Sequence, residues 1–119
     1  MNMNPQGKRV GDCVIRAIST VTERDWDAVY LDLVTKGFAL KDMPSANYVW
    51  GACLRDQGFS RGVIPNACPH CYTVRHFCDD HPEGRYVLAT GSHAIAVIDG
   101  DYIDTWDSGD EVPVYYWER

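Results

Sequence analysis

The sequence has no long hydrophobic segment. Its longest uninterrupted aliphatic run is the stretch from Ala94 to Ile98, whereas a membrane-spanning helix needs about 20 apolar residues. The amino-terminal residues Met1 to Arg9 also lack the apolar centre of a signal peptide. The sequence therefore predicts neither a signal peptide nor a membrane partner.

Positive charge is scarce. The chain has 11 Lys and Arg residues against 17 Asp and Glu residues, which gives a net charge of -6 at pH 7. Proteins that bind nucleic acid usually carry a basic patch, and the sequence has no basic cluster beyond Lys8-Arg9. Nucleic acid is therefore not predicted as a partner. The 45% hydrophobic and 24% charged residues are typical of a globular protein, and residues 1–119 are predicted to form one domain.

The cysteines do not form a complete set of pairs. There are five of them, so at least one thiol is free unless it pairs between chains. Without an export signal, the sequence predicts a reducing, cytoplasmic location. Each cysteine is then a candidate nucleophile, metal ligand or core residue.

Helical patterns precede strand patterns along the chain. Apolar residues recur at helical spacing in four segments, at about 12–20, 22–37, 45–57 and 73–81, with Gly37 ending the second helix and a loop predicted over 60–72. Four later segments have the composition of strands, at 86–90, 93–98, 102–106 and 112–117. This order predicts an α+β fold in which amino-terminal helices pack on one face of a carboxy-terminal antiparallel sheet.

The second and third predicted strands form a predicted hairpin with a histidine and a carboxylate. Asp99 and Gly100 supply the positive φ angles that a tight turn between two strands requires. If the turn is centred on this pair, Ile95 lies opposite Asp104. Asp104 is then a diagonal neighbour of His93 on the same face of the hairpin.

A second register of the hairpin stays open. A turn centred on Gly100 and Asp101 places Asp104 opposite Val97, on the same face but farther from the histidine. In both registers Asp107 lies on the other face. Asp104 is therefore the preferred partner of the histidine, and Asp107 is the second choice.

Cys13 is the predicted nucleophile. With Asp12 as the cap, Cys13 lies in the first turn of a helix, where unpaired N–H groups favour the thiolate. His93 fits the role of base and Asp104 the role of the group that orients the imidazole. A lone cysteine in an amphipathic helix is more often a small core residue, but the combination of the three residue types favours nucleophilic catalysis.

Three segments together resemble a minimal papain-like cysteine peptidase: Gly11-Asp12-Cys13, Ser92-His93-Ala94 and Asp104-Thr105-Trp106. The similarity extends over nearly the whole chain and is greatest to small uncharacterised papain-like proteins of phages and gut bacteria. The NlpC/P60 group has a similar arrangement. The resemblance implies that Cys13 is the nucleophile, His93 the base and Asp104 the orienting residue. It also implies that Trp106 shields the histidine hydrogen bond from water.

The same resemblance implies an oxyanion-stabilising group and a reaction. Papain-like enzymes place a Gln six residues before the cysteine, and that position here is Gly7, so Gln6 is the candidate donor, together with the backbone N–H of Cys13. The expected reaction is hydrolysis of a peptide or amide bond in a peptide or protein substrate through a Cys13 thioester, without a cofactor. Transfer of the acyl group to an amine is a variant of this reaction. The alternative is a non-enzymatic, phage-type interaction protein on the same frame.

A second cluster of cysteine and histidine residues begins inside the predicted loop and continues into the predicted fourth helix. Its spacing resembles a zinc knuckle in which a histidine replaces the last cysteine. The segment Cys68-Pro69-His70-Cys71 also resembles a thioredoxin-like redox motif, although 59–67 is a poor strand. The preferred prediction is that the cluster binds no metal. A zinc site that staples the interaction protein is the alternative, with candidate ligands Cys68, Cys71, His76, Cys78 and His81.

Overall fold

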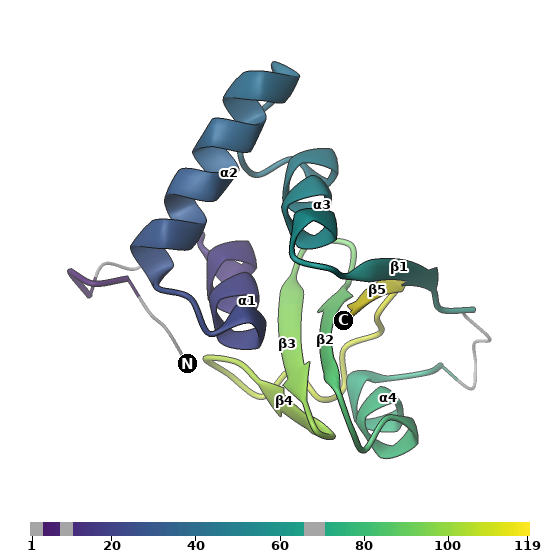
Figure 1. The fold of residues 1–119 in the computed structure, drawn as a ribbon. Helices are drawn as coiled ribbons and strands as arrows, with labels where there is room; N and C mark the ends of the chain where they lie inside the picture. Colours follow the sequence, from purple (N-terminus) through teal and green to yellow (C-terminus); the bar gives the residue numbers. More distant parts are fainter. Residues whose placement is uncertain (1–3, 8–10, 66–70) are drawn as a thin grey trace.

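The computed structural model describes residues 4–7, 11–65 and 71–119 (Figure 1). Within these residues the helices are α1 (Cys13–Thr22), α2 (Trp26–Leu40), α3 (Asn47–Asp56) and α4 (Val74–Asp80). The strands are β1 (Ser60–Val63), β2 (Arg85–Ala89), β3 (Ala94–Ile98), β4 (Asp101–Ile103) and β5 (Tyr115–Glu118). The predicted α+β class is confirmed. None of the described helices has the length and apolar character needed to cross a membrane.

The strands form one antiparallel sheet in the order β1-β5-β2-β3-β4. Alternate residues of β2 and β3 point to opposite faces of this sheet. Val87 and Ala96 belong to the core that the sheet shares with α1, α2 and α3, whereas Leu88 and Ile95 belong to a second core with α4. Figure 1 shows α4 on the other side of the sheet from the first three helices.

The prediction that the helices share one face of the sheet is wrong for α4. The strands β2 and β3 are apolar at nearly every position, which is typical of strands that are buried on both faces. The predicted fourth helix itself is confirmed. Thr73 caps it, accepting a hydrogen bond from the N–H of His76, whose ring accepts one from the N–H of Thr73.

The predicted loop over 60–72 contains a strand that the sequence pattern missed. β1 pairs with β5, and Gly62 lies opposite Tyr116. A Cβ atom on Gly62 would lie 2.3 Å from the Tyr116 ring, so this glycine makes room for the tyrosine. β1 is short, lies at the edge of the sheet and is largely exposed, and it therefore has no alternation of apolar and polar residues to detect.

The second helix ends later than predicted. Gly37 lies inside α2 and is buried, and a Cβ atom there would lie 2.8 Å from the carbonyl oxygen of Asp42. The helix ends instead at Leu40, and the residue after it, Lys41, has a φ of 57° and donates its N–H to the carbonyl groups of Gly37 and Phe38. Gly37 therefore permits close packing of the loop that follows the helix.

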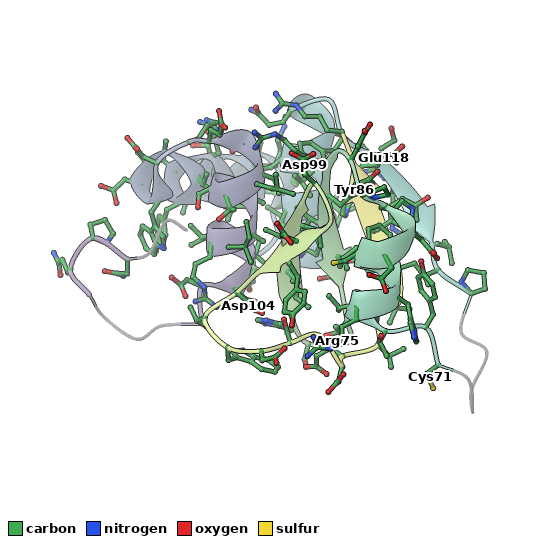
Figure 2. The ribbon with its side chains drawn as sticks, turned by 90° about the horizontal axis from the view of Figure 1, so that it is seen from below. Cys71, Arg75, Tyr86, Asp99, Asp104 and Glu118 are labelled. Atoms are coloured by element: carbon green, nitrogen blue, oxygen red, sulfur yellow. The ribbon has the colours of Figure 1, made fainter. Side chains whose placement is uncertain are left out.

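The hairpin of β3 and β4 has the first of the two predicted registers. Asp99 and Gly100 form its turn with φ angles of 50° and 82°, as a type I′ turn requires. The paired residues are Ala96 with Ile103, Val97 with Tyr102 and Ile98 with Asp101. His93 precedes β3 and Asp104 follows β4, so both lie at the open end of the hairpin. Figure 2 shows Asp99 and Asp104 at its opposite ends.

Candidate active site

His93 and Asp104 form a close, buried pair. Nε2 of His93 lies 2.5 Å from Oδ2 of Asp104, and the other carboxylate oxygen accepts the N–H of Thr105 at 2.8 Å. The side chain of Asp104 is 3% exposed and that of His93 is 12% exposed. Because the carboxylate holds Nε2, the imidazole has Nδ1 left for a second partner.

Cys13 and His93 line the same cavity. Cys13 is the first residue of α1, and the interaction of its thiol with the His93 side chain is the largest cause of its lowered pKa. Burial opposes this effect, while the N–H of Ala94 and the charges of His93 and Arg16 support it. The pKa of His93 is raised to about 9, first by Cys13 and then, against the cost of burial, by Asp104. The interaction therefore shifts the pair towards a thiolate and an imidazolium.

Asp12 has a different role from the predicted helix cap. Its side chain makes no capping hydrogen bond at α1. One carboxylate oxygen accepts from the guanidinium of Arg16, and the other accepts the indole N–H of Trp26 at 2.9 Å. The charged guanidinium one helical turn away is a stronger partner than a backbone N–H. The negative charge next to Cys13 is therefore paired.

Trp106 lies beside the imidazole. The centres of the Trp106 and His93 rings are 5.3 Å apart, with an angle of 30° between the ring planes. About half of the tryptophan surface is exposed. The indole therefore lies next to the imidazole, and its role as a shield for the histidine hydrogen bond stays a prediction.

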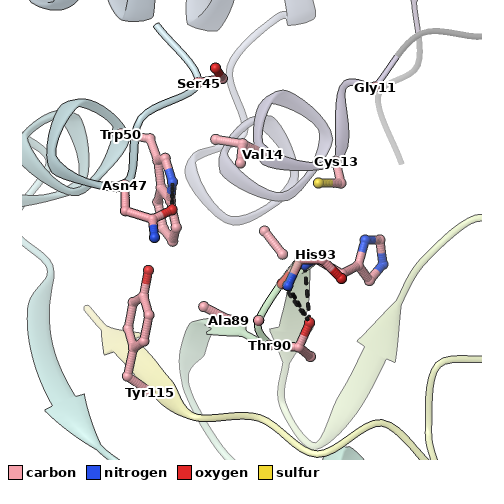
Figure 3. Close-up of a pocket in the computed structure, with 13 residues that line it drawn as sticks. Gly11, Cys13, Val14, Ser45, Asn47, Trp50, Ala89, Thr90, His93 and Tyr115 are labelled. Carbon is pink, nitrogen blue, oxygen red and sulfur yellow. Dashed lines mark hydrogen bonds between the residues drawn. The ribbon is translucent and has the colours of Figure 1, made fainter. Parts of the chain in front are cut away.

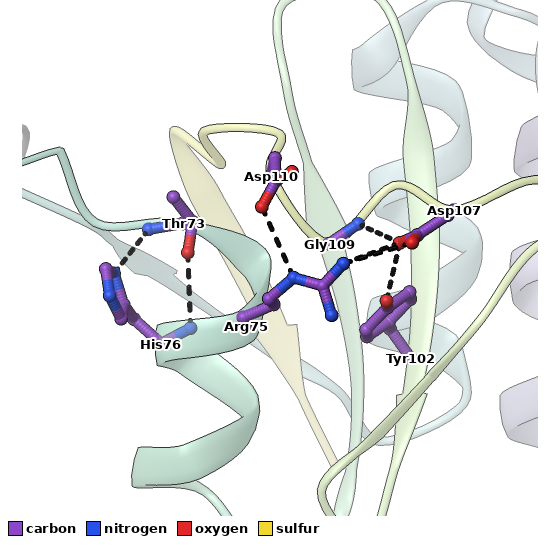
Figure 4. A network of polar contacts seen from close by, with 7 residues as sticks. All are labelled: Thr73, Arg75, His76, Tyr102, Asp107, Gly109 and Asp110. Atoms are coloured by element: carbon purple, nitrogen blue, oxygen red, sulfur yellow. Dashed lines mark hydrogen bonds and ion pairs between the residues drawn. The ribbon is translucent and has the colours of Figure 1, made fainter.

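Asp107, the second choice for the carboxylate, belongs to another network (Figure 4). It accepts from the guanidinium of Arg75 at 3.0 Å, from the hydroxyl of Tyr102 at 2.6 Å and from the N–H of Gly109 at 3.1 Å. Arg75 also pairs with Asp110 at 3.3 Å. These contacts hold the segment after β4 against α4, away from the histidine.

A cavity of about 290 Å³ adjoins the thiol and the imidazole. Its lining includes Cys13 and His93 and, across the cavity in Figure 3, Asn47, Trp50 and Tyr115. Oδ1 of Asn47 accepts the indole N–H of Trp50 at 3.0 Å, which leaves the amide NH₂ group as a donor. Trp50 is expected from the sequence only as a core or groove-wall residue. Asn47 and Tyr115 are not indicated by the sequence pattern, because they lie far from Cys13 in the chain.

Thr90 fixes the backbone in front of β3. Its hydroxyl oxygen accepts the N–H of His93 at 3.0 Å and that of Ser92 at 3.3 Å (Figure 3), and its own N–H donates to the carbonyl of His93 at 2.9 Å. These hydrogen bonds fix the backbone position from which the His93 side chain projects. The sequence Thr90-Gly91-Ser92 is itself a turn signal, and it could have indicated this role.

Gln6 does not lie in the cavity. Its side chain is exposed, and its backbone N–H donates to the side chain of Asn4 at 2.8 Å. The structure therefore does not bring the predicted oxyanion donor to Cys13. The N–H of Cys13, at the first position of α1, is the other predicted donor and lies at the site.

The second cluster forms no metal-binding group within the described residues. The candidate zinc ligand Cys68 lies outside those residues, and Cys71 is disulfide-bonded. The remaining candidates are His76, which caps α4, Cys78, which is buried, and His81, whose ring stacks on Phe77 at 3.8 Å. Each of these three side chains has a packing or capping role in or next to α4.

The site combines a thiol with a lowered pKa, an imidazole held by a carboxylate and an adjoining cavity. This arrangement can attack a carbonyl carbon and pass a proton to a leaving group. No family model, curated protein or solved structure matches the chain. The function is therefore inferred from the geometry of the site.

Proposed function

We propose that the protein is a papain-like thiol hydrolase that cleaves a peptide or amide bond. The observation that carries this proposal is that Cys13 and His93 line one cavity while His93 is held by a hydrogen bond to Asp104. A thiol that only fills space in a core does not need a charged base held by a buried carboxylate.

In the proposed mechanism the Cys13 thiolate attacks the carbonyl carbon of the substrate. The N–H at the start of α1 stabilises the oxyanion that forms. The His93 imidazolium then gives its proton to the departing amine, and a thioester remains on Cys13. His93 next takes a proton from water, whose oxygen attacks the thioester and releases the acid.

The cavity suggests how a substrate would be held. Apart from the reacting pair, its lining residues are uncharged. The amide NH₂ of Asn47 and the hydroxyl of Tyr115 are suited to a peptide carbonyl group, and the ring of Trp50 to an apolar side chain. We therefore expect an uncharged peptide segment next to the scissile bond.

The position of Gln6 favours a second candidate, the non-enzymatic interaction protein. Without a side-chain donor at the oxyanion, the same frame could bind a partner and not turn over. The zinc-stapled form of this candidate has less support, because Cys71 is disulfide-bonded. The acyl-transfer variant uses the same thioester and differs only in whether an amine or water accepts the acyl group.

Alkylation tests the activated thiol directly. Cys13 is expected to react with iodoacetamide at pH 6 to 7 at least about tenfold faster than the same thiol in the denatured protein, because more of it is thiolate. Cys53, whose pKa burial raises to about 11, and Cys78, whose pKa burial also raises, are internal controls that should react slowly. Peptide mass spectrometry of the labelled protein measures all three thiols.

The outcomes separate the two candidates. Equal rates for folded and denatured Cys13 would contradict the activated nucleophile and with it the hydrolase. Fast labelling together with hydrolysis of a mixed library of uncharged peptide amides, lost in Cys13→Ser, supports the hydrolase. Fast labelling without hydrolysis of any library member favours the interaction protein.

Substitution of the two aspartates tests the orienting role. Asp104→Ala is expected to slow alkylation of Cys13 by about tenfold or more near neutral pH, because the imidazolium loses its charged partner. Asp107→Ala is the matched control and should leave the rate within about twofold, because Asp107 binds Arg75 and Tyr102. Equal effects of the two variants would contradict the assignment of Asp104.

A further inference from the structure

α2 has an apolar face that no other part of the described chain covers. The side chains of Leu31 and Phe38 are 63% and 76% exposed, and Tyr30 and Val34 on the same face are also exposed. The opposite face of the helix, with Val29, Leu33 and Gly37, is buried against the rest of the protein. Such a large exposed apolar face on one helix is typical of an interaction surface.

The spacing along this face matches a helix pair. Asp27, Leu31, Val34 and Phe38 follow one another along α2 at intervals of 4, 3 and 4 residues, the spacing of the contact positions in a coiled coil. Lys41, the residue directly after the helix, follows three residues later. We call these five residues the α2 stripe. Its centre is apolar, and its two ends carry opposite charges.

The charged ends have no ion-pair partner among the residues that the structure describes. The ammonium group of Lys41 lies 4.1 Å from the centre of the Phe38 ring, so it remains next to the apolar part of the stripe. Asp27 is exposed in the first turn of α2. The stripe is therefore nearly complementary to a second copy of itself that runs in the opposite direction.

We propose that the α2 stripe binds the α2 stripe of a second copy of this chain in an antiparallel, two-fold symmetric pair. Val34 lies near the two-fold axis, Leu31 packs against Phe38 of the second copy, and Asp27 pairs with Lys41 of the second copy. Because of the two-fold symmetry, the Leu31–Phe38 contact and the Asp27–Lys41 ion pair each occur twice in the dimer. A parallel pair would instead bring like charges together at both ends.

Two other properties of the molecule are consistent with a second copy of the chain as the partner of the α2 stripe. The net charge of -6 disfavours an anionic membrane surface as the partner of an exposed apolar helix. No residue of α2 lines the cavity beside Cys13, so a dimer leaves that cavity open. The proposal is thus independent of the proposed chemistry. Because one pair of helices buries less than a standard interface, we expect a Kd on the order of 10 µM.

Sedimentation equilibrium of the whole chain, over about 1 to 200 µM, tests the dimer. The wild type is expected to dimerise, and Phe38→Glu is expected to raise the Kd by about 30-fold or more, because it places a carboxylate in the centre of the pair. Val63→Glu, which changes an exposed apolar residue on β1, is the matched control and should dimerise as the wild type does.

Charge exchange tests the antiparallel direction. Asp27→Lys and Lys41→Asp are each expected to weaken the dimer by about threefold to tenfold, and the double variant is expected to restore it. A parallel pair predicts no gain from the double variant over the single ones. The proposal is overturned if the wild type stays monomeric across the range, including if it then binds neutral lipid vesicles, or if the double variant does not recover.

Discussion

His93→Ala is expected to abolish hydrolysis and to slow alkylation of Cys13 near neutral pH. The interaction with His93 is the largest cause of the lowered pKa of the thiol, so its loss raises that pKa and leaves less thiolate. Hydrolysis also loses the acid and base for both halves of the reaction, a loss of about 10³-fold or more. Rates of alkylation and of peptide-amide hydrolysis measure the two effects separately.

The pH dependence of the hydrolysis and alkylation rates distinguishes loss of the acid and base from loss of the thiolate. In the wild type the thiolate is lost as the pH falls through the lowered pKa of Cys13, and the imidazolium is lost as the pH rises through about 9. Hydrolysis needs both ionised groups and should follow a bell-shaped curve whose limits belong to the coupled pair. Alkylation needs only the thiolate and should not fall above pH 9. In His93→Ala it should show a single rise, at higher pH than in the wild type.

Rescue provides the control for this variant. Free imidazole is expected to restore part of the labelling rate of folded His93→Ala and to leave the wild type unchanged, because the space of the missing ring opens to the cavity. Circular dichroism establishes that the variant is folded. Labelling of His93→Ala at the wild-type rate would contradict the role of His93 in activating the thiol.

The parts of the site that lie within local elements could be predicted from the sequence. The turn at Asp99 and Gly100 fixes the hairpin register, because both positions need a positive φ. The alternation of faces then separates Asp104 from Asp107 in either register, and the observed register decides how close Asp104 lies to His93. The start of the first helix is also a local pattern, and it places Cys13 at an amino terminus.

The parts that depend on packing between distant segments could not be predicted. Trp26 reaches Asp12 from another helix, and Asn47 meets Tyr115 only when α3 packs beside β5. Neither pairing has a sequence spacing that marks it. Burial of the second face of the sheet, by contrast, could have been predicted, because the nearly continuous apolar residues of β2 and β3 are typical of strands buried on both faces. The prediction that all helices pack on one face of the sheet relied on the order of helices and strands and did not use this apolar pattern.

Asp12→Ala is expected to reduce the free energy of unfolding by about 3 kcal/mol. The side chain of Asp12 is 5% exposed and that of its partner Arg16 is 14% exposed. Removal of one member of a buried pair leaves the other charge without compensation, at a cost of about 3 to 5 kcal/mol. The indole N–H of Trp26 also loses its acceptor. The lower end of the range applies because Arg16 keeps some contact with water. Urea unfolding measures the change.

Two further variants separate charge from hydrogen bonding. Asp12→Asn keeps an acceptor for Trp26 and loses the charge, so an intermediate cost of about 1 to 2 kcal/mol is expected. Asp25→Ala removes an exposed carboxylate that makes no capping hydrogen bond at α2, and its effect should stay within about 0.5 kcal/mol. A cost below about 1 kcal/mol for Asp12→Ala would contradict the importance of the buried pair.

The Asp12→Ala variant also shows whether Asp12 supports the fold or the chemistry. The charge of Arg16 lowers the pKa of Cys13, and without Asp12 that charge is unopposed. Alkylation of Cys13 in folded Asp12→Ala should therefore be at least as fast as in the wild type, although the protein unfolds at lower urea. Slower alkylation of the folded variant would mean that Asp12 acts on the thiol itself. Its position next to the nucleophile would then be a requirement of the reaction, beyond its part in joining α1 to α2.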